Sequence, residues 1–244
     1  MIGDADITGA AAAFCGRGPV PCRGDAMPGY EAARANMVER QLQPNKITDE
    51  RVINAFAIIR RELFVPEKLR AIAYSDTDLP LGNGRYLMAP MVAARLLQAA
   101  EIVRNDNALV VGAGVGYEAG LITLLGRNVV ALEQDGELAR QGRAALVEHR
   151  IATVSFVENP QVSGNRIRSA YDVILFAGAV AELPMEISAQ LSEGGRIVAV
   201  IKADDGPGRA TLITRTGGIL ASRVMFDAAT PLLPGFARKP VFVF

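Results

Sequence analysis

Three glycines between an apolar run and a helical stretch form the clearest chemical signal in the chain. The segment reads Val110-Val-Gly-Ala-Gly-Val-Gly-Tyr117. Glycine allows a sharp turn and lets a ligand approach where a Cβ would collide, and the following helix offers unpaired N–H groups. Glu133 ends the next apolar run, 17 positions after Gly116. Because a carboxylate there can accept hydrogen bonds from both hydroxyls of a ribose, the pattern predicts a nucleotide-like ligand.

Two classes of ligand match this spacing. Gly114-x-Gly116-x-x-Ala119 satisfies the dinucleotide fingerprint, which tolerates a third alanine. Gly112-x-Gly114-x-Gly116 satisfies the tighter loop of S-adenosylmethionine enzymes. The first glycine follows the apolar run directly and no second mononucleotide half follows, so we expect S-adenosylmethionine; a glycine turn needed only for packing is the alternative. The predicted contacts of the cofactor are Gly112, Ala113, Gly114, Gly116, Tyr117, Glu133 and Gln134.

The elements that must position this loop alternate in type. Apolar runs typical of strands cover 108–111, 128–132, 153–157, 171–176 and 196–201, and helical spacing covers 116–125, 136–149 and 181–191. Short strands alternating with helices predict an α/β fold, a Rossmann-like, mostly parallel sheet with helices on both faces. Two further runs, 210–215 and 219–226, flank Thr216-Gly-Gly218 and predict a C-terminal antiparallel hairpin.

The first part of the chain is organised differently. Helical spacing at 30–42, a helix start at 48–51 and a helical stretch at 91–100 predict an N-terminal helical extension, and 76–85 is expected to form a compact loop. We divide the chain into a flexible tail (1–28), a helical region with the substrate-side loop (29–104) and a cofactor-binding domain (105–244). The tail is rich in Gly, Ala and Pro, and Met27 is a candidate for the true first residue.

Composition excludes several functions. The chain of 244 residues carries 26 Lys+Arg against 26 Asp+Glu, which argues against binding nucleic acid or an anionic membrane by bulk charge. No run approaches the roughly 20 apolar residues of a membrane span. We therefore expect a cytoplasmic protein, a monomer or weak homo-oligomer, with neither nucleic acid nor membrane as a partner.

The residues that commonly build metal sites are scarce. The two cysteines, Cys15 and Cys22, lie in the tail, which excludes a disulfide scaffold and a cysteine-based zinc site. The single histidine, His149, stands at a predicted helix end and excludes any site that needs two histidines. Asp204 and Asp205 are neighbours before Gly-Pro-Gly208 and predict a turn. No metal site is expected.

Several stretches resemble the protein-L-isoaspartate O-methyltransferase family over about residues 30–244. The most specific are Arg61-Glu-Leu-Phe-Val-Pro66 and Leu79-Pro-Leu-Gly-Asn-Gly84; Ala73-Tyr-Ser-Asp76, the glycine loop with Tyr117, Glu133 and 191–198 also match. The resemblance implies a seven-stranded methyltransferase sheet, S-adenosylmethionine as cofactor and methyl esterification of isoaspartyl carboxylates in damaged peptides or proteins. A carboxylate is already an anionic nucleophile at neutral pH, so this reaction needs no general base.

The sequence departs from the family pattern at three places. Met88 stands where the family has a serine that is held to assist catalysis, and Arg85 and Tyr86 are candidate replacement donors to the acceptor. Val110 replaces an acid that supports the loop. Asn159 replaces an aspartate near the adenine, and its side-chain carbonyl can still accept a hydrogen bond from the exocyclic amine.

Two further hypotheses stay open beside isoaspartyl methylation. One is a methyltransferase of this family that acts on another acceptor, and the other is a non-catalytic cofactor-binding or interaction protein on the same fold. Val110 and Met88 discriminate between them, because the first bears on cofactor binding and the second on transfer to the acceptor.

Overall fold

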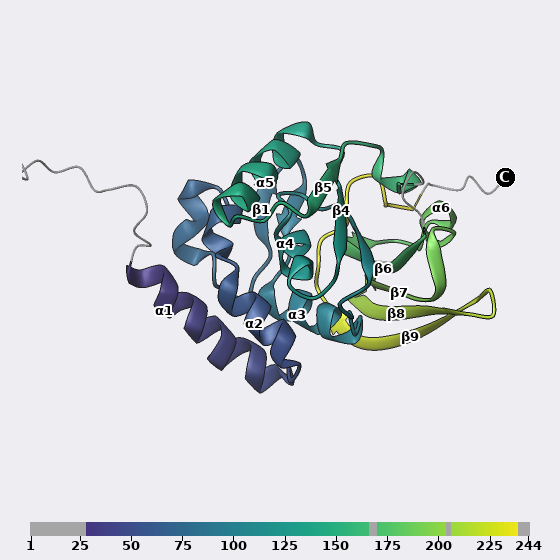
Figure 1. The fold of residues 1–244 in the computed structure, drawn as a ribbon, viewed down its shortest axis with the longest axis horizontal. Helices are drawn as coiled ribbons and strands as arrows, with labels where there is room; N and C mark the ends of the chain where they lie inside the picture. The colour runs from purple at the N-terminus through teal and green to yellow at the C-terminus, as the bar shows by residue number, and fades with distance from the viewer. Residues whose placement is uncertain (1–27, 166–169, 204–205, 239–244) are drawn as a thin grey trace, which may run out of the picture.

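A seven-stranded sheet forms the centre of the computed structural model, which describes residues 28–165, 170–203 and 206–238 (Figure 1). The strand order is β5-β4-β3-β6-β7-β8-β9. Strands β3 to β7 pair in parallel, whereas β8 is antiparallel to β7 and β9 to β8. The bounds are β3 Asn107–Val111, β4 Asn128–Leu132, β5 Val154–Val157, β6 Tyr171–Val180, β7 Leu191–Ile201, β8 Gly208–Thr216 and β9 Ile219–Ala228. The predicted Rossmann-like sheet and its C-terminal hairpin are confirmed.

Both faces of the sheet are buried, one by three helices and the other by one short helix and the C-terminal segment. Helices α3 (Pro90–Ala99), α4 (Tyr117–Thr123) and α5 (Gly136–Glu148) contribute buried residues to the core on one face, together with alternate residues of β3, β4 and β6. The opposite face packs against α6 (Met185–Ser188) and against Leu233 and Phe236 from the C-terminal segment. Figure 1 shows α3, α4 and α5 on one side of the sheet and α6 on the other.

The N-terminal helical region precedes α3. It contains α1 (Pro28–Met37), a continuing π-helix (Val38–Leu42), α2 (Glu50–Ile58) and 3-10 helices at 43–45, 61–64 and 67–72. The predicted helix start at 48–51 is present, but Asp49 rather than Thr48 is the cap, because the Asp49 carboxylate accepts a hydrogen bond from the N–H of Arg51 at 2.9 Å.

The sequence predicts a compact loop at 76–85, but the structure shows a short hairpin there. The segment contains β1 (Leu79–Gly82) and leads into β2 (Arg85–Leu87), which form a two-stranded antiparallel sheet. Leu79 pairs with Leu87, and both are 2% exposed. The strands are short and β1 contains Pro80, so alternation in the sequence was too brief to reveal them.

The predicted helix 181–191 is shorter in the structure. Helix α6 begins after Pro184 and ends at Ser188, and β7 already begins at Leu191. Strand β6 runs on to Val180, because Ala179 exchanges backbone hydrogen bonds with Pro231 and Leu233. This pairing joins residues about fifty positions apart, which local spacing does not record.

Some sequence-based expectations lie outside the described residues. They concern the tail with Cys15, Cys22 and Met27, and the neighbours Asp204 and Asp205. Within the described ranges, no helix has the length and apolar character needed to cross a membrane.

Candidate functional site

Glu133 is the polar centre of the site. It directly follows β4, its side chain is fully buried, and both carboxylate oxygens accept hydrogen bonds. Oε2 accepts from the N–H of Gly114 at 2.6 Å and from Arg85 Nη2 at 2.8 Å. Oε1 accepts from Gln161 Nε2 at 2.8 Å and from the N–H of Asp135 at 3.0 Å. The carboxylate thus links the glycine loop after β3 to the end of β4. This contact is possible because β3 and β4 are neighbouring parallel strands, whose carboxyl ends lie at the same edge of the sheet.

Arg85 places its guanidinium against the glycine loop. Nη2 donates to Glu133 and to the carbonyl of Gly112, and Nη1 lies 3.4 Å from Gln161 Oε1. The residue is 3% exposed, so the ion pair is removed from water. Burial lowers the pKa of Arg85, while the charges of Glu133, Glu118 and Asp135 oppose that shift. Such a pair is retained only where each charge meets its partner.

The glycine loop is covered by side chains from distant segments. Gly112 and Gly114 have φ of 68° and 53°, which L side chains rarely adopt. A Cβ on Gly112 would lie 2.8 Å from Leu233 Cδ2 and 3.1 Å from Arg85 Nη1, and one on Gly114 would lie 3.3 Å from Leu81 Cδ1. The glycines therefore allow both the backbone turn and the close approach of other groups. In this structure the groups that approach them are side chains of the same chain.

Two members of this arrangement were missed by the sequence analysis. Gln161, 1% exposed, touches both Glu133 and Arg85 through its side-chain amide. Leu233 reaches Gly112 from the C-terminal segment. Neither position belongs to a recognisable motif, so only the tertiary structure identifies them.

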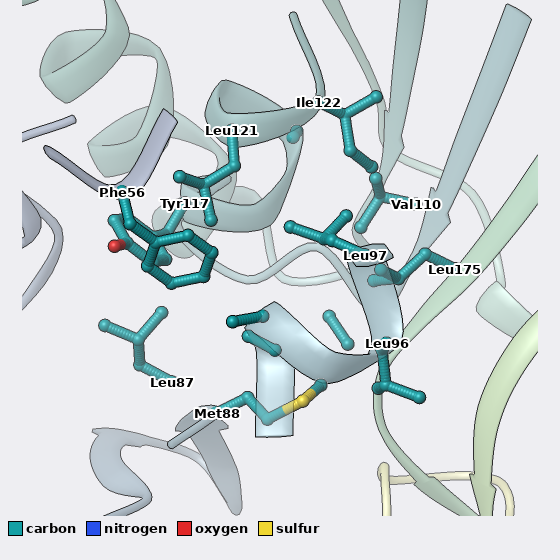
Figure 2. Close-up of a cluster of buried hydrophobic side chains, with 14 of the residues drawn as sticks. Phe56, Leu87, Met88, Leu96, Leu97, Val110, Tyr117, Leu121, Ile122 and Leu175 are labelled. Atoms are coloured by element: carbon teal, nitrogen blue, oxygen red, sulfur yellow. The ribbon is translucent and has the colours of Figure 1, made fainter. Parts of the chain in front are cut away.

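Met88 and Val110, where the sequence departs from the family, are both core positions. Met88 is 1% exposed and Val110 is fully buried. Figure 2 shows Val110 near Leu97, and Met88 in the same apolar cluster. The Met88 carbonyl accepts a hydrogen bond from Arg61 Nη2 at 2.7 Å, so the backbone of this segment is tied to the N-terminal region.

Tyr117 also lies in this core. Its side chain is fully buried, and its ring meets those of Phe56 and Phe64 edge to face at centroid distances of 6.1 Å and 5.4 Å. Figure 2 shows the Phe56 and Tyr117 rings side by side. The guanidinium carbon of Arg61 lies 4.8 Å from the ring centroid. The ring thus joins the glycine loop to the N-terminal helical region.

Of the remaining predicted site residues, Ala113 and Gly116 are buried in the glycine loop, and three others are at the surface. Gln134 and Asn159 are exposed beyond β4 and β5, and Tyr86 is 40% exposed. Tyr86 lines a small cavity together with Gly84, Met88 and Thr230. A larger cavity of about 720 Å³ lies along the β8–β9 hairpin, and none of the predicted site residues lines it.

A second buried carboxylate, Glu118, stands in the first turn of α4. It is 2% exposed, and its Oε1 has no hydrogen-bond partner within the described part of the chain. Burial raises the pKa of Glu118 to about 7, against the favourable charges of Arg61 and Arg85. Asp78 adds a smaller repulsion.

These residues fit S-adenosylmethionine on one condition. The fully buried carboxylate of Glu133 and the glycines at 112 and 114 form a cradle that a Cβ would fill. The flexible end of Arg85 now occupies part of that cradle, together with Leu233. The cofactor therefore requires the guanidinium to leave Glu133, a movement that a long side chain permits.

A glycine loop after β3, an acid after β4 and an antiparallel hairpin closing a parallel sheet define the S-adenosylmethionine-dependent methyltransferase class. Residues 32–225 match the profile of the family Protein-L-isoaspartate(D-aspartate) O-methyltransferase (PCMT). The chain belongs to this family, whose members methylate isoaspartyl carboxylates with S-adenosylmethionine.

Individual relatives agree with this placement. The chain is 39% identical over 170 residues to a protein-L-isoaspartate O-methyltransferase of Koribacter versatilis (strain Ellin345), and the match covers 70% of this chain and 77% of that protein. It is 33% identical over 199 residues to one of Methanoculleus marisnigri, with 82% of this chain and 87% of that protein covered.

Solved structures share the fold. One, of a protein-L-isoaspartate O-methyltransferase, superposes with a TM-score of 0.73 at 23% identity and covers 84% of this chain and 67% of that chain. Another, from Plasmodium falciparum in complex with S-adenosyl-L-homocysteine, gives a TM-score of 0.70 at 20% identity and covers 84% and 97%.

Proposed function

We propose that this site methylates isoaspartyl carboxylates of peptides or proteins, with Glu133 and the glycine loop holding S-adenosylmethionine. The carrying observation is the fully buried Glu133 carboxylate, which is bonded to the N–H of Gly114 at 2.6 Å. An anion held at that place suits the ribose hydroxyls of a nucleoside. Gln134, Asn159 and the exposed edge beyond β5 would line the adenine side.

The chain's own residues bind and orient, because the chemistry needs no general base. When bound, S-adenosylmethionine supplies an activated methyl: the acceptor oxygen bonds to it, the C–S electron pair returns to sulfur, and a methyl ester and S-adenosylhomocysteine result. Holding two reactants in line supplies much of the rate in such transfers. The segment from β1 to Met88, which borders the glycine loop through Arg85, is the proposed acceptor side.

Because positions 88 and 110 hold apolar core residues, other groups must make the hydrogen bonds to the acceptor and the cofactor. Met88 and Val110 offer no hydrogen bond to acceptor or cofactor. Glu133 and the loop backbone must therefore carry cofactor binding, and the acceptor carboxylate needs donors from elsewhere on the cavity wall. Tyr86, with its exposed hydroxyl, is one such donor.

The test is methyl transfer from labelled S-adenosylmethionine to an isoaspartyl peptide, with the aspartyl isomer as matched control. We expect label as a base-labile ester in the isoaspartyl peptide alone. Cofactor binding without transfer to either peptide would favour another acceptor, and no cofactor binding would favour the non-catalytic hypothesis.

We further infer a monomer or weak homo-oligomer that works in the cytoplasm. We also infer that neither nucleic acid nor an anionic membrane is a partner, and this point is supported by the balance of 26 basic and 26 acidic residues. Sedimentation at micromolar concentration and cell fractionation test the oligomeric state and the location.

A further inference from the structure

A buried hydroxyl borders the cavity beside Met88. Thr230 is 3% exposed, and its Oγ1 has no hydrogen-bond partner among the described residues. A buried polar group without a partner costs stability, so such groups in native proteins need an explanation. The hydroxyl lies in the wall of a small cavity that Gly84, Tyr86 and Met88 also line.

The cavity lies beside the glycine loop, but its volume is about 10 Å³, so an acceptor carboxylate can enter only when side chains at its rim move apart. Gly178, within the irregularity in β6, lies on its wall, and Leu233 reaches from there to Gly112 of the glycine loop. Tyr86 and Leu232 line it and are 40% and 37% exposed, so the cavity reaches the surface on their side. The carboxylate of Asp78 also lines it, but one of its oxygens is engaged by the N–H of Ala89 at 2.9 Å.

We propose that Thr230 is a catalytic residue whose hydroxyl donates a hydrogen bond to the acceptor carboxylate. It would supply from the C-terminal segment the donor that Met88, the residue after β2, cannot supply. The inference rests on the proposed function, since it concerns the acceptor of that same reaction. A hydrogen bond to a charged group is worth about ten- to a hundredfold in rate when it is made at the transition state.

The test compares Thr230→Val with Thr230→Ser in methyl transfer to the isoaspartyl peptide. Valine keeps the shape and removes the hydroxyl, so kcat/KM should fall about ten- to a hundredfold, while serine should stay within about threefold of wild type. Affinity for S-adenosylhomocysteine and thermal stability should not fall in either variant, because the hydroxyl has no partner to lose. Thr211→Val is the matched control, since Thr211 bonds to the Arg209 carbonyl on β8.

Three results would overturn this role. Wild-type kcat/KM in Thr230→Val would show that the hydroxyl is not used. Equal losses in the valine and serine variants would show that the residue acts through packing. An inactive wild type would instead overturn the proposed function, and this inference would fall with it.

A second inference starts from a different observation, the guanidinium that fills the cofactor cradle. Arg85 Nη2 lies 2.8 Å from Glu133 Oε2, the same oxygen that the Gly114 N–H reaches at 2.6 Å. The Glu133 carboxylate therefore cannot receive ribose hydroxyls at full strength while the ion pair stands. Glu118 is buried with Oε1 unpartnered among the described residues, and its charge acts on Arg85.

We infer that Arg85 is an internal competitor of the cofactor, which pairs with Glu133 as in this structure and turns to Glu118 when the cofactor binds. The inference again rests on the proposed function, because it assumes that Glu133 receives the ribose. Arg61, the other cation near Glu118, donates to the carbonyls of Ala73 and Met88 through Nε and Nη2, while its Nη1 has no partner among the described residues. Glu118 thus retains capacity for a second guanidinium.

Calorimetric titration with S-adenosylhomocysteine at about pH 8, where Glu118 is ionised, tests this exchange. Arg85→Gln should bind about ten- to a hundredfold more tightly than wild type, because one charge-assisted hydrogen bond no longer has to be broken. Glu118→Gln should weaken binding in the wild-type background and leave it unchanged beside Arg85→Gln. Arg196→Gln is the control, since Arg196 pairs with Asp106 at the opposite ends of the strands.

Each other outcome decides against the exchange. Equal or weaker binding by Arg85→Gln would make Arg85 a bystander or a cofactor ligand, and an unchanged Glu118→Gln would remove the second position. If neither wild type nor Arg85→Gln binds, the cofactor assignment itself fails. Binding by both with equal affinity leaves the proposed function standing and refutes only this inference.

Discussion

Replacing Glu133 by glutamine should destabilise the fold far more than replacing Arg85 by glutamine. Both side chains are withdrawn from water, at 0% and 3% exposure, and they form an ion pair at 2.8 Å. Without the carboxylate, the guanidinium keeps only neutral acceptors, the Gly112 carbonyl and Gln161 Oε1. Breaking a buried pair in this way costs about 3–5 kcal/mol.

The opposite replacement leaves a better-satisfied charge. Without Arg85, the Glu133 carboxylate still accepts from the N–H groups of Gly114 and Asp135 and from Gln161 Nε2. The loss is then one charge-assisted hydrogen bond, about 1.5–3 kcal/mol. The double variant removes both charges, so its stability should lie near that of Arg85→Gln alone. The cycle should show a coupling energy of at least about 2 kcal/mol.

Urea unfolding followed by far-ultraviolet circular dichroism measures these differences, since the chain has no tryptophan to report by fluorescence. For a domain of this size, about 2–4 °C of melting temperature accompanies each kcal/mol, so Glu133→Gln should melt about 6–20 °C lower. A loss below about 1 kcal/mol in Glu133→Gln, or strictly additive single effects, would refute the buried pair.

This asymmetry decides how the cofactor assignment should be tested. A loss of cofactor binding in Glu133→Ala would mix a missing ligand with a weakened fold. The Arg85→Gln/Glu133→Gln variant reduces that ambiguity, because it removes both charges of the buried ion pair together. Compared with Arg85→Gln alone, it should keep the fold and bind S-adenosylhomocysteine more weakly.

Three further predictions concern the scaffold. Burial lowers the pKa of His149 below 6.5, and its neutral Nε2 accepts a hydrogen bond from the N–H of Arg60 at 3.1 Å. The free energy of unfolding should therefore fall, relative to His149→Gln, as the pH drops from 6.5 toward the lower pKa of the folded state. An NMR titration of this single histidine should give a pKa below 6.5. Asp135→Ala should cost about 0.5–2 kcal/mol in urea, and Asp135→Asn much less, because Asp135 caps α5. Gly116→Ala should lower the melting temperature, since its Cβ would lie 2.7 Å from Phe156 Cζ at a φ of 78°, and Phe156→Leu should recover part of that loss.

The local sequence pattern predicted the strands and helices of the parallel sheet well, because buried residues there are consecutive or regularly spaced along the chain. Strand β4 occupies the predicted 128–132, and the predicted helix at 136–149 differs from α5 by one residue. Apolar runs bounded by glycine mark parallel strands that are buried on both faces. The predicted neighbourhood of Gly114 and Glu133 follows for the same reason, since both come directly after adjacent strands.

What local pattern missed are contacts between residues far apart in the chain. Arg85 and Glu133 are 48 positions apart, and nothing around Arg85 distinguishes a buried partner of a carboxylate from a solvated arginine. The β1–β2 hairpin, with strands of four and three residues, is too short for alternation to be visible.

The substitutions at 88 and 110 gain a different meaning from these contacts. As single positions they subtract a hydroxyl and an acid from the family pattern. In the structure both side chains are core residues, and the Thr230 hydroxyl, which has no partner among the described residues, lines the same small cavity as Met88. A polar group can be moved to another segment without loss of chemistry if it reaches the same space, because the reaction depends on position rather than on sequence order. The effect of Thr230→Val therefore measures whether the missing hydroxyl was lost or relocated.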